Sequence, residues 1–437
     1  MEFLPVILGI VVLVLLITWV KLDTFISFML VCLMVGLMGG LSVGQTMSAI
    51  QKGIGDTLGE LVIILGFGAM LGKLVAESGA ANKITDSLVR KFGKQNIQWA
   101  VMVTGFIVGI SMFYEVGFVI LVPLIIAIAY NTGLPLLYLG LPMLAALSVT
   151  HGFLPPHPAP TALAGIYNAD LGKTLLYGLI TGIPAILAAK FALQKTMMRI
   201  QPELNREYIA ERNDKYPVPP LWICLLVPLL PVIFIGGASL IQAFTGKNAI
   251  ISSLGNPAAA MLLSVLAAIY FLGIRTGRHI KEVMGFLSSA VSSIAVVLLI
   301  IGGAGAFKEV IVTTHMSNAL GGALSGLGMS PILLAWVIAA IIRVSVGSAT
   351  VAALTAASIM APMIGHTTVP PELLVLATGA GSIFFSHIND GGFWLFKEYF
   401  NVSIKETLLS WTLMETTVSI VGLIDIVLLN LILKVIS

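Results

Sequence analysis

The sequence predicts an all-α polytopic membrane protein, and three observations support this fold class. Hydrophobic side chains make up 58% of the 437 residues and charged side chains only 10%, whereas soluble globular domains carry about 25% charged residues. The hydrophobic residues gather in runs long enough for a helix to cross a bilayer, which takes about 20 residues. The few charged residues fall in short clusters between these runs. We therefore expect the chain to cross a lipid bilayer many times.

Ten runs have the length and composition of membrane-spanning helices. They lie at residues 3–20, 24–43, 61–77, 134–165, 171–194, 221–243, 257–274, 284–306, 371–397 and 404–434. The first run lacks the basic start and the small-residue cleavage site of a signal peptide. We therefore interpret it as a retained first span.

Two further apolar runs, 97–131 and 330–364, are each about 35 residues long, which is too long for a single crossing. Polar or small residues interrupt both runs at the middle, at 111–115 and 345–350. We interpret each run as a re-entrant hairpin that enters and leaves on the same side. With both chain termini outside, sixteen of the 23 Lys and Arg residues then lie in the cytoplasm and five outside. This distribution follows the positive-inside rule.

The chain is also self-similar at a nearly constant offset. Asn168 and Asn401 lie in similar segments 233 positions apart, and Ser111 and Ser348 are 237 positions apart. We predict a first repeat at residues 1–195, a cytoplasmic linker at 196–218 and a second repeat at 219–437. Each half holds five crossings and one hairpin, so the second half would be inverted relative to the first. Inverted repeats are typical of secondary transporters, whose substrate site lies near the membrane midplane.

Polar residues inside the two hairpins are functional candidates, because such groups are costly in a membrane. Glu115 lies at the break of the first hairpin, where desolvation disfavours its charged form and suits it to carry a proton. The alternative is a structural partner for Arg343, the other buried charge. In the second hairpin, Gly347 and Ser348 let the chain turn and start a helix, whose N-terminus would attract a carboxylate. Each hydroxyl there could instead bond a backbone carbonyl.

Two predicted spans are broken helices. In 134–165, four prolines within the segment Thr150-His-Gly-Phe-Leu-Pro-Pro-His-Pro-Ala-Pro160 cannot continue a helix. Broken backbone at membrane depth is tolerated only against protein or a water-filled cavity. His151 is there either a hydrogen-bond donor to a substrate or a structural histidine. In 371–397, Asp390 either binds a hydroxyl or a cation, or caps the helix that follows.

These breaks supply the candidate site residues. For substrate binding they are Ser111, Tyr114, Thr150, His151, Arg343, Gly347, Ser348, Thr350, His387, Asn389 and Asp390; for proton coupling they are Glu115, Asp390 and His151. We expect no catalytic residue, cofactor or metal, since the histidines are too few for a metal site. Both cysteines lie in apolar runs, so neither a disulfide framework nor a thiolate site is expected.

Four motifs carry a family resemblance: Tyr114-Glu-Val-Gly-Phe118, Val149-Thr-His-Gly-Phe-Leu-Pro-Pro-His-Pro158, Gly347-Ser-Ala-Thr-Val351 and the block from Ser386 to Phe400. With them the chain resembles the gluconate permease (GntP) family of the ion transporter superfamily, almost end to end. The resemblance implies proton-coupled import of gluconate or a closely related sugar acid across the bacterial inner membrane. It also implies a homodimer and an elevator movement, in which a transport domain with both hairpins slides against a scaffold. Relatives carry idonate, fructuronate or D-serine instead, but the motifs here, with Arg343, are more similar to the gluconate branch.

Other function classes fit less well. A net charge of only +3, with the charged residues in short clusters between apolar runs, argues against a nucleic-acid partner. An ATP-driven pump would need a phosphate loop, and the nearest fragment, Gly172-Lys-Thr174, lacks the upstream glycine. A membrane-embedded hydrolase that uses Ser111 or Ser348 near His151 is one remaining alternative. A channel is another, because broken helices also build filters.

Overall fold

The computed structural model describes residues 4–112, 114–203, 216–245, 248–316, 326 and 328–436, which fold into helices with no β-strand among them. The first half contains α1 (Leu4–Thr18), α2 (Thr24–Met38), α3 (Val43–Glu77), α4 (Ala80–Phe92), α5 (Ile97–Ser111), α6 (Tyr114–Thr132), α7 (Leu136–Phe153), α8 (Pro158–Tyr167), α9 (Leu171–Ala192) and α10 (Gln194–Arg199). Residues 204–215 of the predicted linker lie outside the described residues.

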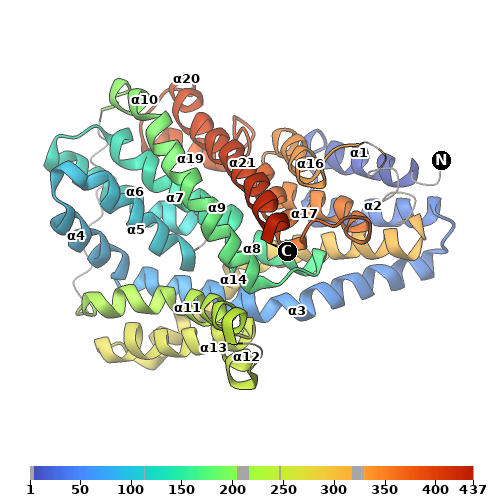
Figure 1. The fold of residues 1–437 in the computed structure, drawn as a ribbon, viewed down its shortest axis with the longest axis horizontal. Helices are drawn as coiled ribbons and strands as arrows, with labels where there is room; N and C mark the ends of the chain where they lie inside the picture. Colours follow the sequence, from blue (N-terminus) through green and yellow to red (C-terminus); the bar gives the residue numbers. More distant parts are fainter. Residues whose placement is uncertain are drawn as a thin grey trace.

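The second half begins with α11 (Leu221–Thr245), α12 (Ala249–Leu254), α13 (Pro257–Ala268) and α14 (Ile280–Thr313). It continues with α16 (Pro331–Val346), α17 (Ala349–Met360), α18 (Pro371–Ser382), α19 (Gly391–Tyr399), α20 (Ile404–Thr407) and α21 (Leu413–Ile436). A π-helical turn, η6 (Leu408–Thr412), joins α20 to α21. The two longest helices, α3 and α14, pack against each other across the molecule, and α4 to α7 lie at the opposite end from α1 and α2 (Figure 1).

The helices are apolar enough to make this a multi-pass membrane protein. Among the described residues, seven helical segments qualify by length and composition, or eight if the two parts of α3, bent by 47°, form one span. The predicted ten crossings include α1 and α2, which have only 15 residues each. Such a helix is about 22 Å long, against a hydrocarbon core of about 30 Å. The number of crossings therefore stays a prediction.

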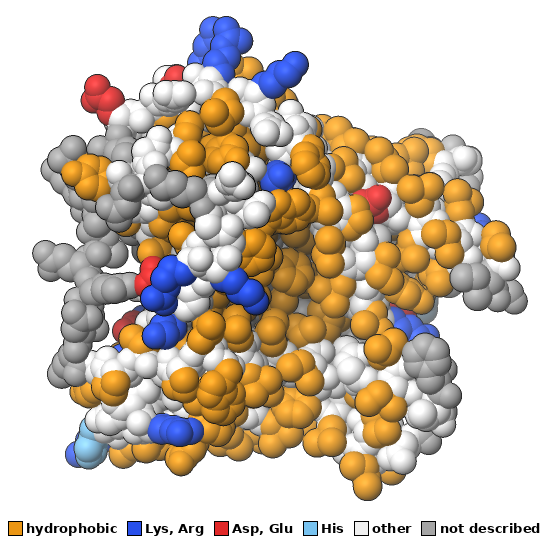
Figure 2. Space-filling view, turned by 60° about the vertical axis from the view of Figure 1, so that its left-hand side comes forward, with side chains coloured by type: hydrophobic (Ala, Val, Ile, Leu, Met, Phe, Trp, Pro, Cys, Tyr) orange, Lys and Arg blue, Asp and Glu red, His pale blue; other side chains and the backbone are white. Residues whose placement is uncertain are grey.

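The outer surface agrees with a bilayer environment. Hydrophobic side chains cover most of the face drawn in Figure 2, and the charged side chains gather in a few separate clusters. Large apolar residues such as Ile180, Leu266 and Leu428 are more than half exposed. In water, such a surface would be an aggregation hazard, whereas lipid tails solvate it.

The similar segments around Asn168 and Asn401 form the same local structure. Both asparagines have a positive φ, of 54° and 50°. The side chains of Asp170 and Ser403 then cap the next helices, α9 and α20. In each segment the threonine four residues after the cap donates its hydroxyl to the carbonyl of the capping residue, at 2.7 Å and 2.9 Å. This equivalence supports a duplication, while the inverted orientation of the two halves stays a prediction.

Two helix breaks meet near the centre of the molecule. α7 ends before the proline-rich turn 154–157, and α18 ends before the irregular connection 383–390. The two helices touch at Gly152 and Gly379, where a Cβ on Gly379 would lie 2.1 Å from the carbonyl oxygen of Gly152. Only glycine permits this approach, which brings the two breaks next to each other.

A helix pair packs against each broken helix. α5 and α6 are separated by residues 112–113, and α5 lies along α7. α16 and α17 are separated by Gly347 and Ser348, and α16 lies along α18. The turns of these pairs and the breaks of the long helices place most of the predicted polar residues in one region.

Candidate functional site

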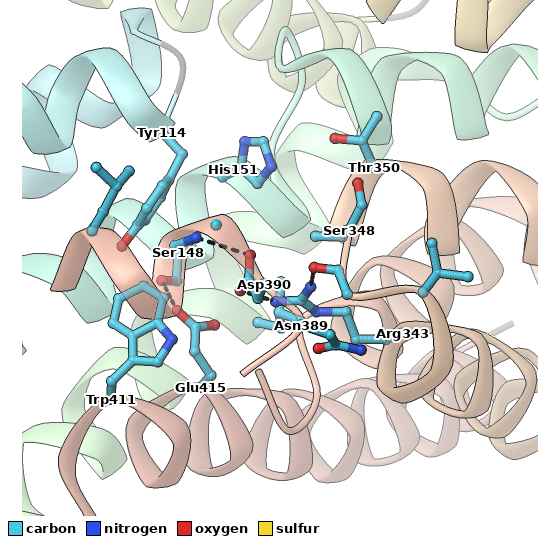
Figure 3. A pocket seen from close by; sticks show the side chains of 17 residues that line it. Tyr114, Ser148, His151, Arg343, Ser348, Thr350, Asn389, Asp390, Trp411 and Glu415 are labelled. Carbon is cyan, nitrogen blue, oxygen red and sulfur yellow. Dashed lines mark hydrogen bonds and ion pairs between the residues drawn. The ribbon is translucent and has the colours of Figure 1, made fainter. Parts of the chain in front are cut away.

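A cavity of about 330 Å³ lies where these turns and breaks meet. It is formed by the starts of α6 and α19, by α7, by the turn between α16 and α17, and by η6 with the first turn of α21 (Figure 3). The lining residues are Tyr114, Ser148, His151, Arg343, Val346, Gly347, Ser348, Ala349, Thr350, Ile383, Asn389, Asp390, Gly391, Gly392, Leu395, Trp411 and Glu415. The cavity therefore takes residues from both halves of the chain.

An ion pair between Arg343 and Asp390 is the main charged feature of the cavity. Arg343 is 4% exposed, its Nη2 contacts Asp390 Oδ2, and its Nη1 donates to the carbonyl of Gly347. Asp390 also accepts from the hydroxyl of Ser386 and, at 3.0 Å, from the backbone N–H of Gly392. Asp390 is thus both the N-cap of α19 and the counter-ion of Arg343. The sequence-based alternative that Asp390 caps a helix is confirmed.

The turn at Gly347 packs tightly against residues 387–389, which precede α19. Gly347 has a φ of +83°, and a Cβ there would lie 2.1 Å from the carbonyl oxygen of Asn389. The amide of Asn389 donates in return to the carbonyl of Val344 at 2.8 Å. His387 contacts the same carbonyl through Nε2 at 3.0 Å. The α16–α17 turn and the α19 connection are therefore one packed unit beside the cavity.

Two helix N-termini face the cavity. α17 begins after Ser348, whose Oγ accepts from the N–H of Val351 at 3.3 Å, and Ala349 and Thr350 line the cavity. α19 begins after Asp390, and Gly391 is part of the lining. The first N–H groups of a helix have no partner within it and carry partial positive charge. Together with Arg343, they make this end of the cavity suited to an anion.

Aromatic rings line the other end. The ring of Tyr114 lies 5.9 Å from the rings of both His151 and Trp411, in edge contacts. The ring of His151 is also 5.6 Å from that of His157, which is buried and donates from Nε2 to the carbonyl of Gly109 at 2.5 Å. His157 therefore links the α7–α8 break to α5, whereas His151 lines the cavity.

Among the lining residues that were not predicted from the sequence, three have side chains that form hydrogen bonds: Ser148, Trp411 and Glu415. The hydroxyl of Ser148 donates to Oε1 of Glu415 at 2.5 Å, and both side chains are buried. Nε1 of Trp411 donates to Ser386 Oγ at 2.8 Å, and this hydroxyl in turn donates to Asp390. An ionisable residue inside the apolar run 404–434 was the available signal for Glu415. Ser148 and Trp411 gave no comparable signal, because small hydroxyls and indoles are common in membrane helices.

Three predicted residues lie outside the cavity lining. The hydroxyl of Ser111 donates to the carbonyl of Val108 at 3.1 Å, and that of Thr150 to the carbonyl of Leu147 at 2.8 Å. His387 holds the α16–α17 turn, as described above. The side chain of Glu115 lies outside the described residues. Among the described residues, no group of His, Cys, Asp and Glu side chains could hold a metal ion.

A polar cavity between broken helices of a multi-pass helical protein is the kind of site found in secondary transporters, so the fold and the cavity define a membrane transporter. The chain matches the model of the family described as GntP family permease over residues 1–432, and it belongs to this family. It is 46% identical to the High-affinity gluconate transporter of Escherichia coli (strain K12), over 99% of this chain and 100% of that protein. It is 44% identical to the Gnt-II system L-idonate transporter of the same strain, over 97% of this chain and 98% of that protein.

The fold is also similar to a solved structure, that of the YdaH transporter of Alcanivorax borkumensis. The two chains align with a TM-score of 0.68 at 17% identity, over 94% of this chain and 97% of that chain. At this identity, the likeness concerns the fold alone. The family match and the two curated relatives agree with a transporter rather than an enzyme.

Proposed function

We propose that the protein imports gluconate or a closely related sugar acid together with protons across the bacterial inner membrane. The observation that carries this proposal is the cavity itself, in which Arg343 lies beside Ser348, Thr350 and Asn389. A sugar acid has one carboxylate and several hydroxyls, which require a cationic end and a series of hydrogen-bonding groups. Idonate, fructuronate and D-serine are the alternative substrates for the same fold.

The carboxylate is proposed to bind at the Arg343 end. Arg343 uses Nη1 and Nη2 in contacts with the protein, but its buried Nε has no hydrogen-bond partner among the described residues. A guanidinium has five N–H donors, so a second carboxylate can share it with Asp390. The N-terminus of α17 supplies further N–H groups. His151 and Asn389 are then placed for the substrate hydroxyls.

Proton coupling follows from the charge of the substrate. Bringing an anion into a cell against an inside-negative potential costs about 2.3 kcal/mol per charge for each 100 mV. A carrier that takes up a proton with each anion avoids this cost. The sequence-based candidates for the coupling group are Glu115, Asp390 and His151. Asp390 is paired with Arg343 in the structure, and the other two stay predictions.

The proposed transport movement is an elevator within a homodimer. The helices of the α5–α6 pair both pack on the broken helix α7. The helices of the α16–α17 pair both pack on the broken helix α18. This packing supports their movement as one transport domain against the rest of the chain. The two inverted repeats, at 1–195 and 219–437, and termini outside the cytoplasm are parts of the same proposal.

Uptake by the purified protein in lipid vesicles tests the function. We expect labelled gluconate to accumulate under an inward pH gradient, with a rate that saturates with concentration. Unlabelled idonate, fructuronate and D-serine, added in turn, would rank the substrates by competition. Absence of gluconate uptake would contradict the proposal. Flux that does not saturate would indicate a channel.

A further inference from the structure

Glu415 is a buried carboxyl group at the cavity that forms an ion pair with no cation among the described residues. It lies in the first turn of α21 and is 4% exposed. Glu415 forms no salt bridge within the described part of the chain. Arg343, the Lys or Arg residue of the cavity lining, is paired with Asp390 instead. A buried carboxylate without a cation loses its hydration and gains no ion pair in return. The neutral acid avoids this loss.

The partner of Glu415 suits both states of a carboxyl group. Ser148 Oγ lies 2.5 Å from Glu415 Oε1. A hydroxyl donates to an ionised carboxylate, and it can rotate to accept from a protonated one. The hydrogen bond can therefore persist while Glu415 gains or loses a proton. Asp390 differs, because its three contacts from Arg343, Ser386 and Gly392 all donate to it.

The charges around the cavity link this proton to an anionic substrate. The ionisable groups that face Glu415 are Arg343 from α16, Asp390 before α19, His151 from α7 and Tyr114 from α6; α9 and α18, which also pack on α21, add none to the described lining. Arg343 and Asp390 line the same cavity as Glu415, so their charges act on its carboxyl group. With Glu415 ionised, these three groups carry one net negative charge, which repels an anion. With Glu415 protonated, they are neutral together.

We infer that Glu415 is the group that binds the transported proton, and that the proton must be bound for the substrate anion to occupy the cavity. The proton is taken from water by the Glu415 carboxylate on one side of the membrane. It returns to water on the other side after the anion has left. The inference rests on the proposed function and assigns its coupling step to a residue that the sequence alone did not single out.

The variant Glu415→Gln tests this assignment, because glutamine resembles the neutral acid in size and can still bond Ser148. In vesicles without a pH gradient, we expect it to exchange labelled for unlabelled gluconate at a rate near that of the original protein. Under a gradient of one pH unit, which supports up to about tenfold accumulation per proton carried, we expect it to accumulate nothing. Its apparent affinity for gluconate should no longer change with pH.

Two matched variants separate the alternatives. Asp425→Asn removes another carboxyl of α21 that does not line the cavity, and it should accumulate gluconate normally. Glu115→Gln tests the sequence-based candidate in the same assay. Accumulation by Glu415→Gln, or its loss in Glu115→Gln alone, overturns the inference. If Glu415→Gln loses exchange as well, the variant Glu415→Asp, which keeps a carboxyl group, is measured next. It must show both exchange and accumulation, and failure to do so overturns the inference too.

The same experiment distinguishes this inference from the proposed function. If the original protein takes up no gluconate, the proposed function fails. If the original protein and Glu415→Gln both accumulate gluconate under the gradient, the function holds and only the assignment to Glu415 fails.

Discussion

Arg343 and Asp390, 47 residues apart in the chain, form an ion pair that ties the end of α16 to the start of α19. The pair joins two neighbouring elements that both contribute residues to the cavity lining. It also neutralises the charge of each partner at a place with little water. Its removal should therefore affect both stability and binding.

Asp390→Asn is expected to destabilise the protein strongly. Removing one partner of a buried pair leaves an uncompensated charge and typically costs about 3–5 kcal/mol. Thermal unfolding in detergent, followed by fluorescence, measures the effect. Glu398→Gln is the control, because Glu398 pairs with Lys397 with its side chain 62% exposed, and such pairs contribute about 1 kcal/mol or less. Equal shifts for the two variants would show that the Arg343–Asp390 pair is not a structural tie.

Gly347→Ala should disrupt the cavity more than a comparable glycine variant elsewhere. A residue other than glycine at positive φ costs about 1–2 kcal/mol, and the added Cβ would also collide with the carbonyl of Asn389. Gly277 has a φ of +91° and open space around its Cβ position, so Gly277→Ala measures the backbone strain alone. We expect a lower unfolding temperature and weaker gluconate uptake for Gly347→Ala than for Gly277→Ala. Similar values for both would mean that the contact with Asn389 has no consequence.

Ser348→Ala is expected to weaken substrate binding beyond its effect on the helix. Loss of an N-cap costs about 1 kcal/mol of stability, and Ser42, the N-cap of α3 away from the cavity, gives the matched control. A hydrogen bond to a charged group contributes about 1.5–3 kcal/mol, which corresponds to a tenfold or larger change in affinity. Gluconate binding by calorimetry should therefore weaken in Ser348→Ala and not in Ser42→Ala. If Ser348→Ala and His151→Ala both bind normally, the substrate site lies elsewhere.

The elevator proposal predicts opposite changes in accessibility at the two helix turns. Cysteines at Tyr114 and Ala349, in a background without Cys32 and Cys224, would report the two sides of the cavity. Substrate should protect one from a membrane-impermeant reagent and expose the other. A cysteine at Lys281, in a predicted cytoplasmic segment, should react only from that side under all conditions. Reaction of both cavity cysteines from one side in every condition would favour a channel.

Features that depend on neighbouring residues in the chain were open to prediction. Apolar runs indicate membrane helices because each helix satisfies its own backbone hydrogen bonds, and the composition alone therefore identified an all-helical membrane protein. Pro155 and Pro156 end α7 for an equally local reason, and Pro158 starts α8. The four motifs of the sequence also pointed to the family, which the family model confirms.

The composition of the cavity depended on contacts between distant segments. Ser148 and Glu415 are 267 residues apart, and no local pattern indicates that their side chains meet. Ser111 and Ser348 occupy related places in the sequence, yet only Ser348 lines the cavity, because the Ser111 hydroxyl bonds back to its own helix. Local sequence determined where helices form and break, since propensity and hydrophobicity act over a few residues. Only the packing of α7, α16, α19 and α21 decided which polar groups meet, because burial and pairing of charges depend on the whole fold.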